Sequence, residues 1–302
     1  MLTVGTFDGV HAGHRAVLEQ LRAVADRHNA STTLLSFTPH PRVVLDPNHH
    51  GLKLLNTLEE RRELLADAGL DNLVLHPFTK DLANLTPWEY AKTLLADCIK
   101  PVAVVIGDDH RFGRHRAGNF DTLVTLGQAF DFKVEALDAH HVEDVRVSST
   151  KVRQALEDGR VDEANTWLGK PYPTTGKVVH GEALGRELGF PTANLRIDNP
   201  LKLLPAHGVY AVWCQTPDGQ WHPSMANVGT RPTIHDNAPT SIEVHVFDAS
   251  GDWYEKPLTL RWMHWMRGEV KFDSKKALVA ALEADRTKAL NLLASSPKPG
   301  MA

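Results

Sequence analysis

Cysteine is scarce in this 302-residue chain: Cys98 and Cys214 alone occur, far apart and outside any Cys-x-x-Cys pair. A disulfide framework and a thiolate zinc site are therefore not indicated, and a reducing cytoplasm is the expected compartment. Long apolar runs are missing too, since none reaches the roughly 18 residues that a membrane-spanning helix needs. The first residues, Met-Leu-Thr-Val-Gly, lack the basic and apolar stretches of an export signal. No membrane partner is expected.

A cationic excess is also lacking. Lys plus Arg total 33 and Asp plus Glu total 37, which gives a formal net charge of −4, so nucleic acid is disfavoured as the main partner. Neither a Gly-x-x-x-x-Gly-Lys-Ser/Thr nor a Gly-x-Gly-x-x-Gly segment occurs, which leaves a P-loop ATPase and a dinucleotide dehydrogenase without sequence support. What is present is an ordinary soluble composition, 42% hydrophobic and 23% charged, with a length that suits two domains.

The first half of the chain alternates short apolar runs with helical patterns, which is typical of a mostly parallel sheet covered by helices. Strands are predicted at residues 2–4, 33–37 and 101–106, and the last is apolar throughout, as a central strand is. Helices are predicted from apolar residues at helical spacing and from two Thr-x-x-Glu capping boxes. We therefore expect an α/β domain over residues 1–168.

After Leu168 the pattern changes, because two prolines and a glycine within a few residues favour a linker. Short apolar runs then follow one another, separated by Gly, Pro, Asp and Asn turns. This arrangement predicts an antiparallel β-barrel over residues 169–294, which ends in a helix capped by Ser274. Residues 295–302 are expected to form a C-terminal tail. The predicted strands of the barrel are 177–179, 209–213, 225–228, 242–247 and 258–262.

Glycine and histidine fill the turn between the first strand and the first helix, residues 5–14. In an open parallel sheet, ligands bind beyond the carboxyl ends of the strands, and a helix N-terminus offers free N–H groups to phosphate. His11 and His14 are three residues apart, about one helical turn, so both can face one phosphate group and stabilise charge that develops on a nucleotide. Taken alone, this pair is more typical of a glycine-rich turn with two surface histidines.

Three further segments favour the nucleotide site. Two of them, residues 38–42 and 107–113, follow predicted strands and would lie at the same edge of the sheet. The third, residues 148–153, begins a helix with hydroxyl groups and two cations, which makes a second terminus compatible with phosphate. Zinc is a weak alternative, because His11 and His14 have no third ligand near them in the sequence.

Four glycines precede Thr192 and Asn194 within residues 176–194. Glycines let the backbone turn around phosphates, and alternate oxygens of an extended chain project to one side, where Thr192 and Asn194 can reach Mg²⁺. A long loop shaped by turn glycines is an equally good interpretation from the chemistry alone.

Strict alternation at residues 242–246 separates three apolar side chains from Glu243 and His245. A carboxylate on a rigid strand can take a proton from a substrate hydroxyl as that oxygen attacks phosphorus. A solvated outer strand face would show the same pattern.

Together these segments resemble the prokaryotic bifunctional riboflavin kinase/FMN adenylyltransferases, also called FAD synthetases, over nearly the whole chain. The first half carries the resemblance in Gly-Thr-Phe-Asp-Gly-Val-His-Ala-Gly-His at 5–14, in residues 107–113 and in Ser-Ser-Thr-Lys-Val-Arg at 148–153. The second half carries it in Gly-Arg-Glu-Leu-Gly-Phe-Pro-Thr-Ala-Asn at 185–194, in Asn-Val-Gly-Thr-Arg-Pro-Thr at 227–233 and in Glu-Val-His at 243–245. The order and spacing of these motifs are much more specific than any one of them.

The resemblance implies an α/β nucleotidyltransferase domain with a Rossmann-like parallel sheet, followed by a riboflavin kinase barrel with a C-terminal helix. The barrel would phosphorylate riboflavin with ATP to give FMN, with Glu243 as the base and Thr192 and Asn194 holding Mg²⁺ and phosphates. The N-terminal domain would adenylylate FMN with a second ATP, releasing pyrophosphate and giving FAD, with His11 and His14 stabilising the transition state. Further ATP- or flavin-binding residues implied are Gly5, Phe7, Asp8, Gly9, Gly13, Asp108, Asp109, Arg111, Ser149, Thr150, Arg153, Gly181, Gly185, Arg186, Gly189, Pro191 and Asn227.

The sequence departs from the family pattern at three places. Only four residues precede Gly5, where the family usually has a longer lead-in to the first strand. His110 stands where the family usually has Phe, and Glu255 follows Tyr254 where the family usually has Gly. None of these departures removes a predicted reacting group.

Two alternatives to a bifunctional enzyme stay open at this point. One is an enzyme with a single active module, or with an N-terminal half that acts on another phosphorylated substrate. The other is a protein that binds flavin or nucleotide without turnover. The presence of His11, His14 and Glu243 favours chemistry, because binding alone needs no group where transition-state charge or a departing proton appears. The sequence leaves self-association open.

Overall fold

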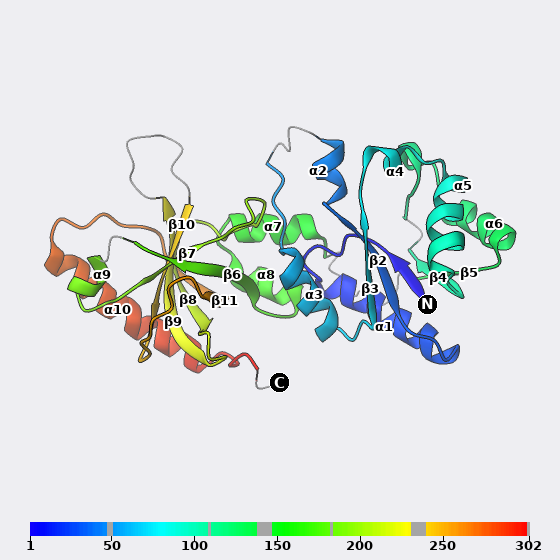
Figure 1. Ribbon diagram of the computed structural model, residues 1–302. Helices are drawn as coiled ribbons and strands as arrows, with labels where there is room; N and C mark the ends of the chain where they lie inside the picture. The colour runs from blue at the N-terminus through cyan, green and yellow to red at the C-terminus, as the bar shows by residue number, and fades with distance from the viewer. Residues whose placement is uncertain (47–50, 108–109, 138–146, 182–183, 231–239, 301–302) are drawn as a thin grey trace. The chain divides into compact units, whose positions relative to one another are not determined.

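The computed structural model describes most of the chain, which divides into two compact units (Figure 1). The first unit comprises Met1–Leu52 and Arg61–Val147, and the second comprises Lys53–Glu60 and Ser148–Ala302. Each unit is built around one sheet. The described residues are 1–46, 51–107, 110–137, 147–181, 184–230 and 240–300, without the side chains of Leu184 and Arg186.

Five parallel strands form the sheet of the first unit, as the alternating pattern predicts. In chain order they are β1 (Leu2–Val4), β2 (Thr33–Thr38), β3 (Asn72–Pro77), β4 (Ala103–Ile106) and β5 (Lys133–Ala136). Their spatial order is β3-β2-β1-β4-β5, so the chain reverses its direction of winding between β1 and β4. Every residue of β4 is buried, which confirms the central strand expected from its apolar sequence.

Both faces of this sheet are buried, in two separate cores. The helices of this part of the chain are α1 (Ala12–Arg27), α2 (Pro41–Leu45), α3 (Leu58–Asp67), α4 (Lys80–Asn84), α5 (Pro87–Tyr90), the π-helix η1 (Ala91–Ile99), the 3-10 helix η2 (Arg114–Arg116) and α6 (Phe120–Phe130). Leu34 of β2 joins the core that includes Leu18 and Leu21 of α1, and Leu35 joins the core that includes Leu94 of η1. The apolar residues of α1 that recur at helical spacing are therefore buried, as expected of a helix that covers a sheet.

Six antiparallel strands of the second unit close into a barrel, which confirms the predicted architecture. They are β6 (Tyr172–Val179), β7 (Ala193–Arg196), β8 (Gly208–Gln215), β9 (Trp221–Thr230), β10 (Thr240–Val246) and β11 (Pro257–Arg267). Around the closed sheet their order is β10-β7-β6-β11-β8-β9. The helices are α7 (Ser149–Glu157), α8 (Val161–Leu168), α9 (Leu184–Glu187) and α10 (Lys275–Ala294).

Two features of the barrel differ from the sequence-based expectation. The predicted linker is shorter, because β6 begins at Tyr172 and includes Pro173. A proline fits there because that end of β6 is paired with β11 alone, while pairing with β7 starts only at Lys177. The strand β7 was not predicted, because its four residues form no apolar run. They become a strand by pairing with β6 and β10.

The C-terminal helix α10 packs against one side of the barrel, as Figure 1 shows. Its predicted cap is present, since the Ser274 hydroxyl accepts a hydrogen bond from the Ala277 amide at 3.2 Å. Ala289 and Leu293 are buried in the core that also contains Val209 and Met225. Among the described residues, no helix combines the length and apolar character needed to cross a membrane.

Glu255 has a left-handed backbone, with a φ of 61°, at the position where the resembling family usually has Gly. We expect Glu255→Gly to be more stable than Glu255→Ala by about 1 kcal/mol, because an L side chain is strained in this conformation. Both variants lose the exposed ion pair with Lys177, whose nitrogen lies 3.2 Å from the Glu255 carboxylate. The comparison therefore isolates the backbone, and urea unfolding measures it. An alanine variant as stable as the glycine variant would contradict the strain.

Candidate functional site

The turn between β1 and α1 brings its two histidines into ring contact. The imidazole centroids of His11 and His14 are 3.7 Å apart with 15° between their planes, and the Phe7 ring stacks on His14 at 4.5 Å. His11 also caps α1, because its Nδ1 accepts a hydrogen bond from the His14 backbone amide at 3.3 Å. The structure thus places both histidines together at a helix N-terminus, where a phosphate can be bound.

The same turn is tightly constrained by its backbone and by one distant arginine. The φ angles of Phe7, Gly9 and Val10 are 48°, 93° and 42°, and two of these three residues are not glycine, so the turn stores strain. The buried Arg61 of α3 donates from Nη1 to the Thr6 carbonyl at 2.7 Å. Burial lowers the pKa of Arg61, and the nearby Asp8 carboxylate raises it. Arg61 was not predicted from the sequence, because no local pattern links it to a turn 55 residues earlier.

His14 is held in its neutral form. Burial lowers the pKa of His14 well below its ordinary value, and the adjacent His11 lowers it further. The His14 Nδ1 atom is buried and has no hydrogen-bond partner within the described part of the chain. A bound phosphate would favour the protonated ring, since an opposite charge raises the pKa of a histidine.

Acidification is expected to destabilise the first unit through His14. An unfolded chain protonates histidine near pH 6.5, whereas the folded unit keeps His14 neutral to a lower pH. Below about pH 6.5 the unfolded state therefore binds more protons than the folded state. As the pH decreases, the free energy of unfolding decreases, until the pH passes the lowered pKa of His14 in the folded state. Between about pH 7.5 and about pH 5.5, thermal unfolding should show a smaller loss of Tm for His14→Gln than for wild type. Equal losses would contradict a depressed pKa at His14.

Two of the three further nucleotide-site segments flank this turn. Because β2 and β4 are the neighbours of β1 in a parallel sheet, Thr38 and Gly107, at which the two segments begin, lie at the same carboxyl edge, as predicted. After β4, the Arg111 side chain donates from Nη1 to the carbonyl of His110 at 2.8 Å. Asp108 and Asp109 lie outside the described residues.

The third segment forms the predicted helix, α7. Its cap is Ser148, whose hydroxyl accepts a hydrogen bond from the Lys151 amide at 3.3 Å. Ser149 and Thr150 lie in the first turn, and Arg153 donates from Nε to the Lys53 carbonyl at 2.7 Å. This helix belongs to the second compact unit, so its proximity to the histidines stays a prediction.

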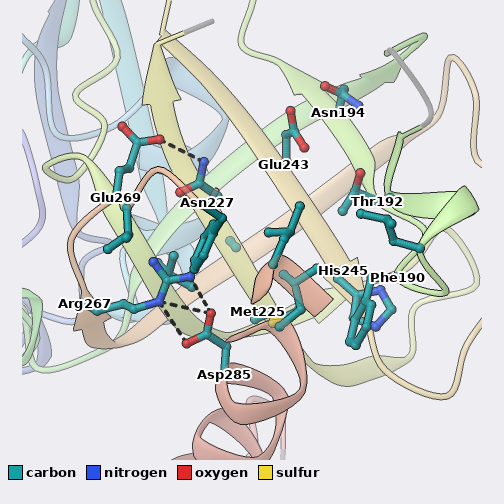
Figure 2. Close-up of a pocket in the computed structure, with 18 residues that line it drawn as sticks. Phe190, Thr192, Asn194, Met225, Asn227, Glu243, His245, Arg267, Glu269 and Asp285 are labelled. Atoms are coloured by element: carbon teal, nitrogen blue, oxygen red, sulfur yellow. Dashed lines mark hydrogen bonds and ion pairs between the residues drawn. The ribbon is translucent and has the colours of Figure 1, made fainter. Parts of the chain in front are cut away.

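A row of three polar side chains crosses neighbouring strands of the barrel. In the strand register, Glu243 of β10 lies opposite Asn194 of β7 on one side and opposite Asn227 of β9 on the other. Directly opposed residues of antiparallel strands present their side chains on the same face. Figure 2 shows Glu243 between the two asparagines, with Thr192 beside them. The predicted residues Thr192, Asn194, Asn227 and Glu243 are therefore brought together.

This row lines a cavity of about 310 Å³ on the barrel side that faces α10. Its wall also contains apolar and aromatic side chains, and its volume is of the order of small-ligand pockets. We refer to it as the Glu243 cavity, and its lining includes Gly185, Phe190, Thr192, Asn194, Met225, Asn227, Glu243, His245, Arg267, Glu269, Phe272 and Asp285. The predicted alternation along β10 is confirmed, because Glu243 and His245 line this cavity while Val244 and Val246 line another.

The second cavity, of about 300 Å³, shares Thr192 and Asn194 with the Glu243 cavity. Trp253 and Tyr254 contribute to its wall, so we refer to it as the Tyr254 cavity. The Tyr254 ring stacks on His180 with centroids 4.0 Å apart. The segment that carries Thr192 and Asn194 therefore touches two cavities at once.

Two glycines of the stretch before Thr192 line these cavities. Gly181 lines the Tyr254 cavity, and any side chain at this position would overlap the Asn194 amide, so glycine permits the close approach. Gly185 lines the Glu243 cavity, and Gly189 ends the following turn with a φ of 82°. Pro191 lines the Tyr254 cavity, and its carbonyl lies 2.8 Å from the His245 Nδ1. The side chain of Arg186 and residues 231–233 of the Asn227 motif lie outside the described part of the chain.

Three charged residues of the Glu243 cavity were not predicted from the sequence. Arg267, at the end of β11, donates to the buried Asp285 of α10 from Nε at 3.0 Å and from Nη2 at 2.6 Å. Glu269 accepts a hydrogen bond from the Asn227 amide at 3.2 Å. No local pattern marks these residues, because their contacts depend on how α10 packs against β9 and β11 and on the approach of Glu269 to Asn227, 42 residues earlier in the chain.

Two family models match the chain: FAD synthetase over residues 1–151 and riboflavin kinase over residues 168–293. Proteins named bifunctional riboflavin kinase/FMN adenylyltransferase are similar along nearly the whole length. The one from Listeria monocytogenes is 35% identical over 94% of this chain and 90% of its own, and the one from Pseudomonas fluorescens is 36% identical over 97% and 93%. A crystal structure described as a macrolide-efflux protein from Streptococcus pneumoniae is 33% identical, with a TM-score of 0.87 over 96% of this chain and 93% of that one.

Proposed function

The chain belongs to the family of bifunctional riboflavin kinase/FMN adenylyltransferases, and from this membership we propose which of its residues carry out the two transfers. The FAD synthetase module comes first and the riboflavin kinase module second. We place the adenylyltransferase in residues 1–168, the kinase in residues 169–294 and a tail in residues 295–302. The observation that carries the kinase assignment is the row of Asn194, Glu243 and Asn227 in one cavity.

In the kinase module, Glu243 acts as the general base. Its carboxylate takes the proton of the riboflavin 5′-hydroxyl as that oxygen attacks the γ-phosphorus of ATP, and the bond to the β-phosphate oxygen breaks to release ADP. The strand register supports this role, because neighbours on both sides hold Glu243 in a rigid ladder. A fixed base removes the entropy loss of orienting it during each turnover.

The two cavities suit the two substrates of this reaction. The Glu243 cavity, with Phe190, Met225 and Phe272 in its wall, offers an apolar and aromatic site for the flavin ring. The Tyr254 cavity offers a second such site for the nucleoside of ATP. The ATP phosphates would then pass the shared segment at Thr192 and Asn194, within reach of the Glu243 carboxylate.

The residues at this junction also fit Mg²⁺. The hydroxyl of Thr192 and the amide oxygen of Asn194 are the hard oxygen donors that this cation accepts, and Mg²⁺ is commonly held by few protein ligands together with substrate phosphates. When bound, it neutralises phosphate charge. Thr192 and Asn194 orient the phosphate chain, and Gly181, Gly185, Arg186 and Gly189 border it.

In the adenylyltransferase module, an FMN phosphate oxygen attacks the α-phosphorus of ATP and pyrophosphate leaves, without a covalent enzyme intermediate. His11 and His14 stabilise the charge that develops at this phosphorus. Their stacked rings at the start of α1 support this role. Around them, Gly5, Phe7, Asp8, Gly9 and Gly13 shape the turn, and the proposed substrate contacts are Asp108, Asp109, Arg111, Ser149, Thr150 and Arg153.

A product assay tests the proposal. Purified protein is incubated with riboflavin, Mg²⁺ and ATP, and FMN, FAD, ADP and pyrophosphate are followed with time. Sequential appearance of FMN and FAD is expected, with ADP from the first step and pyrophosphate from the second. FMN that accumulates without FAD, or FAD that forms only when FMN is supplied in place of riboflavin, would indicate a single active module. Turnover of neither riboflavin nor supplied FMN would indicate a binding protein. We propose the cytoplasm as the compartment, and riboflavin, FMN and ATP rather than nucleic acid or membrane as partners; self-association is left open.

A further inference from the structure

His245 lies two residues from Glu243 on the same face of β10, and it is buried. The register places it opposite Met225 of β9, and only 8% of its surface is exposed. Its ring centroid lies 5.3 Å from that of Phe190 and 5.4 Å from that of Phe247, both in edge-on contact. These two contacts hold the plane of the imidazole in one orientation.

The ring nitrogen Nδ1 of His245 lies 2.8 Å from the Pro191 carbonyl oxygen. A carbonyl oxygen can only accept, so Nδ1 carries the proton in this bond. Burial lowers the pKa of His245, with a smaller lowering from Arg286, and this outweighs the Pro191 bond and the Asp248 carboxylate, which raise it. The ring is therefore a neutral Nδ1–H donor near pH 7.

Pro191 lies two residues before Ala193, where the strand ladder between β7 and β10 begins. Pairing between β10 and β7 joins Glu243 to Asn194 and Val244 to Ala193, and it ends there. Thr192 therefore lies just beyond the last paired residue, while it still lines both cavities. Proline has no N–H, so its carbonyl oxygen is its one backbone hydrogen-bonding group. A hydrogen bond that holds this oxygen in place therefore also fixes the plane of the peptide bond between Pro191 and Thr192.

We propose that His245 is a positioning residue of the kinase, which sets the place of Thr192 relative to Glu243 by its hydrogen bond to Pro191. The inference rests on the proposed riboflavin kinase activity of the barrel. The general base and the phosphate-binding hydroxyl belong to different segments of the chain, and the ladder pairs Glu243 with Asn194 but does not include Thr192. Through its hydrogen bond to Pro191, the His245 side chain also holds the segment beyond the ladder, which contains Thr192. Figure 2 shows His245 on the same side of the cavity as Thr192 and Phe190.

Two substitutions separate hydrogen bonding from packing. His245→Phe keeps an aromatic ring against Phe190 and Phe247 and removes the donor. His245→Asn removes the ring but carries an amide N–H close to the place of Nδ1. We expect His245→Phe to lower kcat for FMN formation about tenfold, the equivalent of one lost hydrogen bond, while adenylylation of supplied FMN is unchanged. His245→Asn should recover most of this loss, whereas a packing role predicts the opposite order.

The possible outcomes distinguish a failure of the proposed kinase function from a failure of the proposed role of His245. Wild-type protein that forms no FMN overturns the proposed kinase function itself. Wild-type protein that forms FMN, with His245→Phe equal to it or with His245→Asn slower than His245→Phe, overturns only the role of His245. Nitrogen-15 NMR of wild-type histidines tests the same bond without a substitution. The Nδ1–H tautomer of His245 is expected, and an Nε2–H tautomer overturns the inference.

Discussion

Glu243→Gln is expected to lower the rate of FMN formation from riboflavin by about 10²–10⁴-fold, the usual contribution of a general base. Glutamine keeps the size of the side chain between Asn194 and Asn227 but cannot take a proton from the substrate hydroxyl. Binding of riboflavin and ATP should change little, so the loss should appear in kcat rather than in KM. Steady-state assays with riboflavin as substrate, read as FMN and ADP, measure it.

The same Glu243→Gln protein should still convert supplied FMN to FAD at the wild-type rate, because the histidine turn belongs to the other compact unit. His14→Gln is the reciprocal variant, with FMN formation retained and adenylylation reduced. A well-folded Glu243→Gln protein that makes FMN at the normal rate would remove Glu243 from the chemistry. Loss of both steps in either folded variant would argue against two independent modules.

Local sequence patterns predicted the features of these sites that depend on nearby residues. Alternation placed Glu243 and His245 on one face because a strand repeats every two residues, and their shared cavity confirms it. The parallel arrangement of the first unit likewise followed from alternating strands and helices, and it placed the histidine turn at the carboxyl edge. The register that sets Asn227 and Asn194 opposite Glu243 could not be predicted in this way, because it depends on pairing between distant segments.

The remaining parts of the sites depend on tertiary contacts that leave no local signal. Arg61 reaches the Thr6 carbonyl from 55 residues away, and Asp285 of α10 meets Arg267 only because the helix packs on the barrel. Glu60 makes one contact that the sequence predicts and one that it does not. Its capping box with Thr57 is visible in the sequence and is present, with hydrogen bonds of 3.0 and 3.2 Å. The same carboxylate also accepts a hydrogen bond from a lysine 142 residues later, and nothing in the sequence predicts this contact.

That lysine, Lys202, is fully buried in the second unit. Its ammonium donates at 2.7 Å to the Glu60 carboxylate and, also at 2.7 Å, to the carbonyls of Leu55 and Pro173, so all three N–H groups are used. Glu60 in turn accepts from the Thr175 amide at 3.0 Å. The pair therefore joins the segment Lys53–Glu60 to β6, and it lies apart from both cavities of the proposed kinase.

Lys202→Met is expected to lower the free energy of unfolding of the second unit by about 3–5 kcal/mol, because it leaves the Glu60 carboxylate buried without its counter-charge. Adding Glu60→Gln should recover part of this loss, since the double variant buries no net charge. Lys177→Met is the matched control: its ion pair with Glu255 is exposed, so its removal should change stability by at most about 1 kcal/mol. Urea unfolding followed by tryptophan fluorescence compares the four proteins. Similar losses for Lys202→Met and Lys177→Met would mean that the buried pair contributes no more than a surface contact.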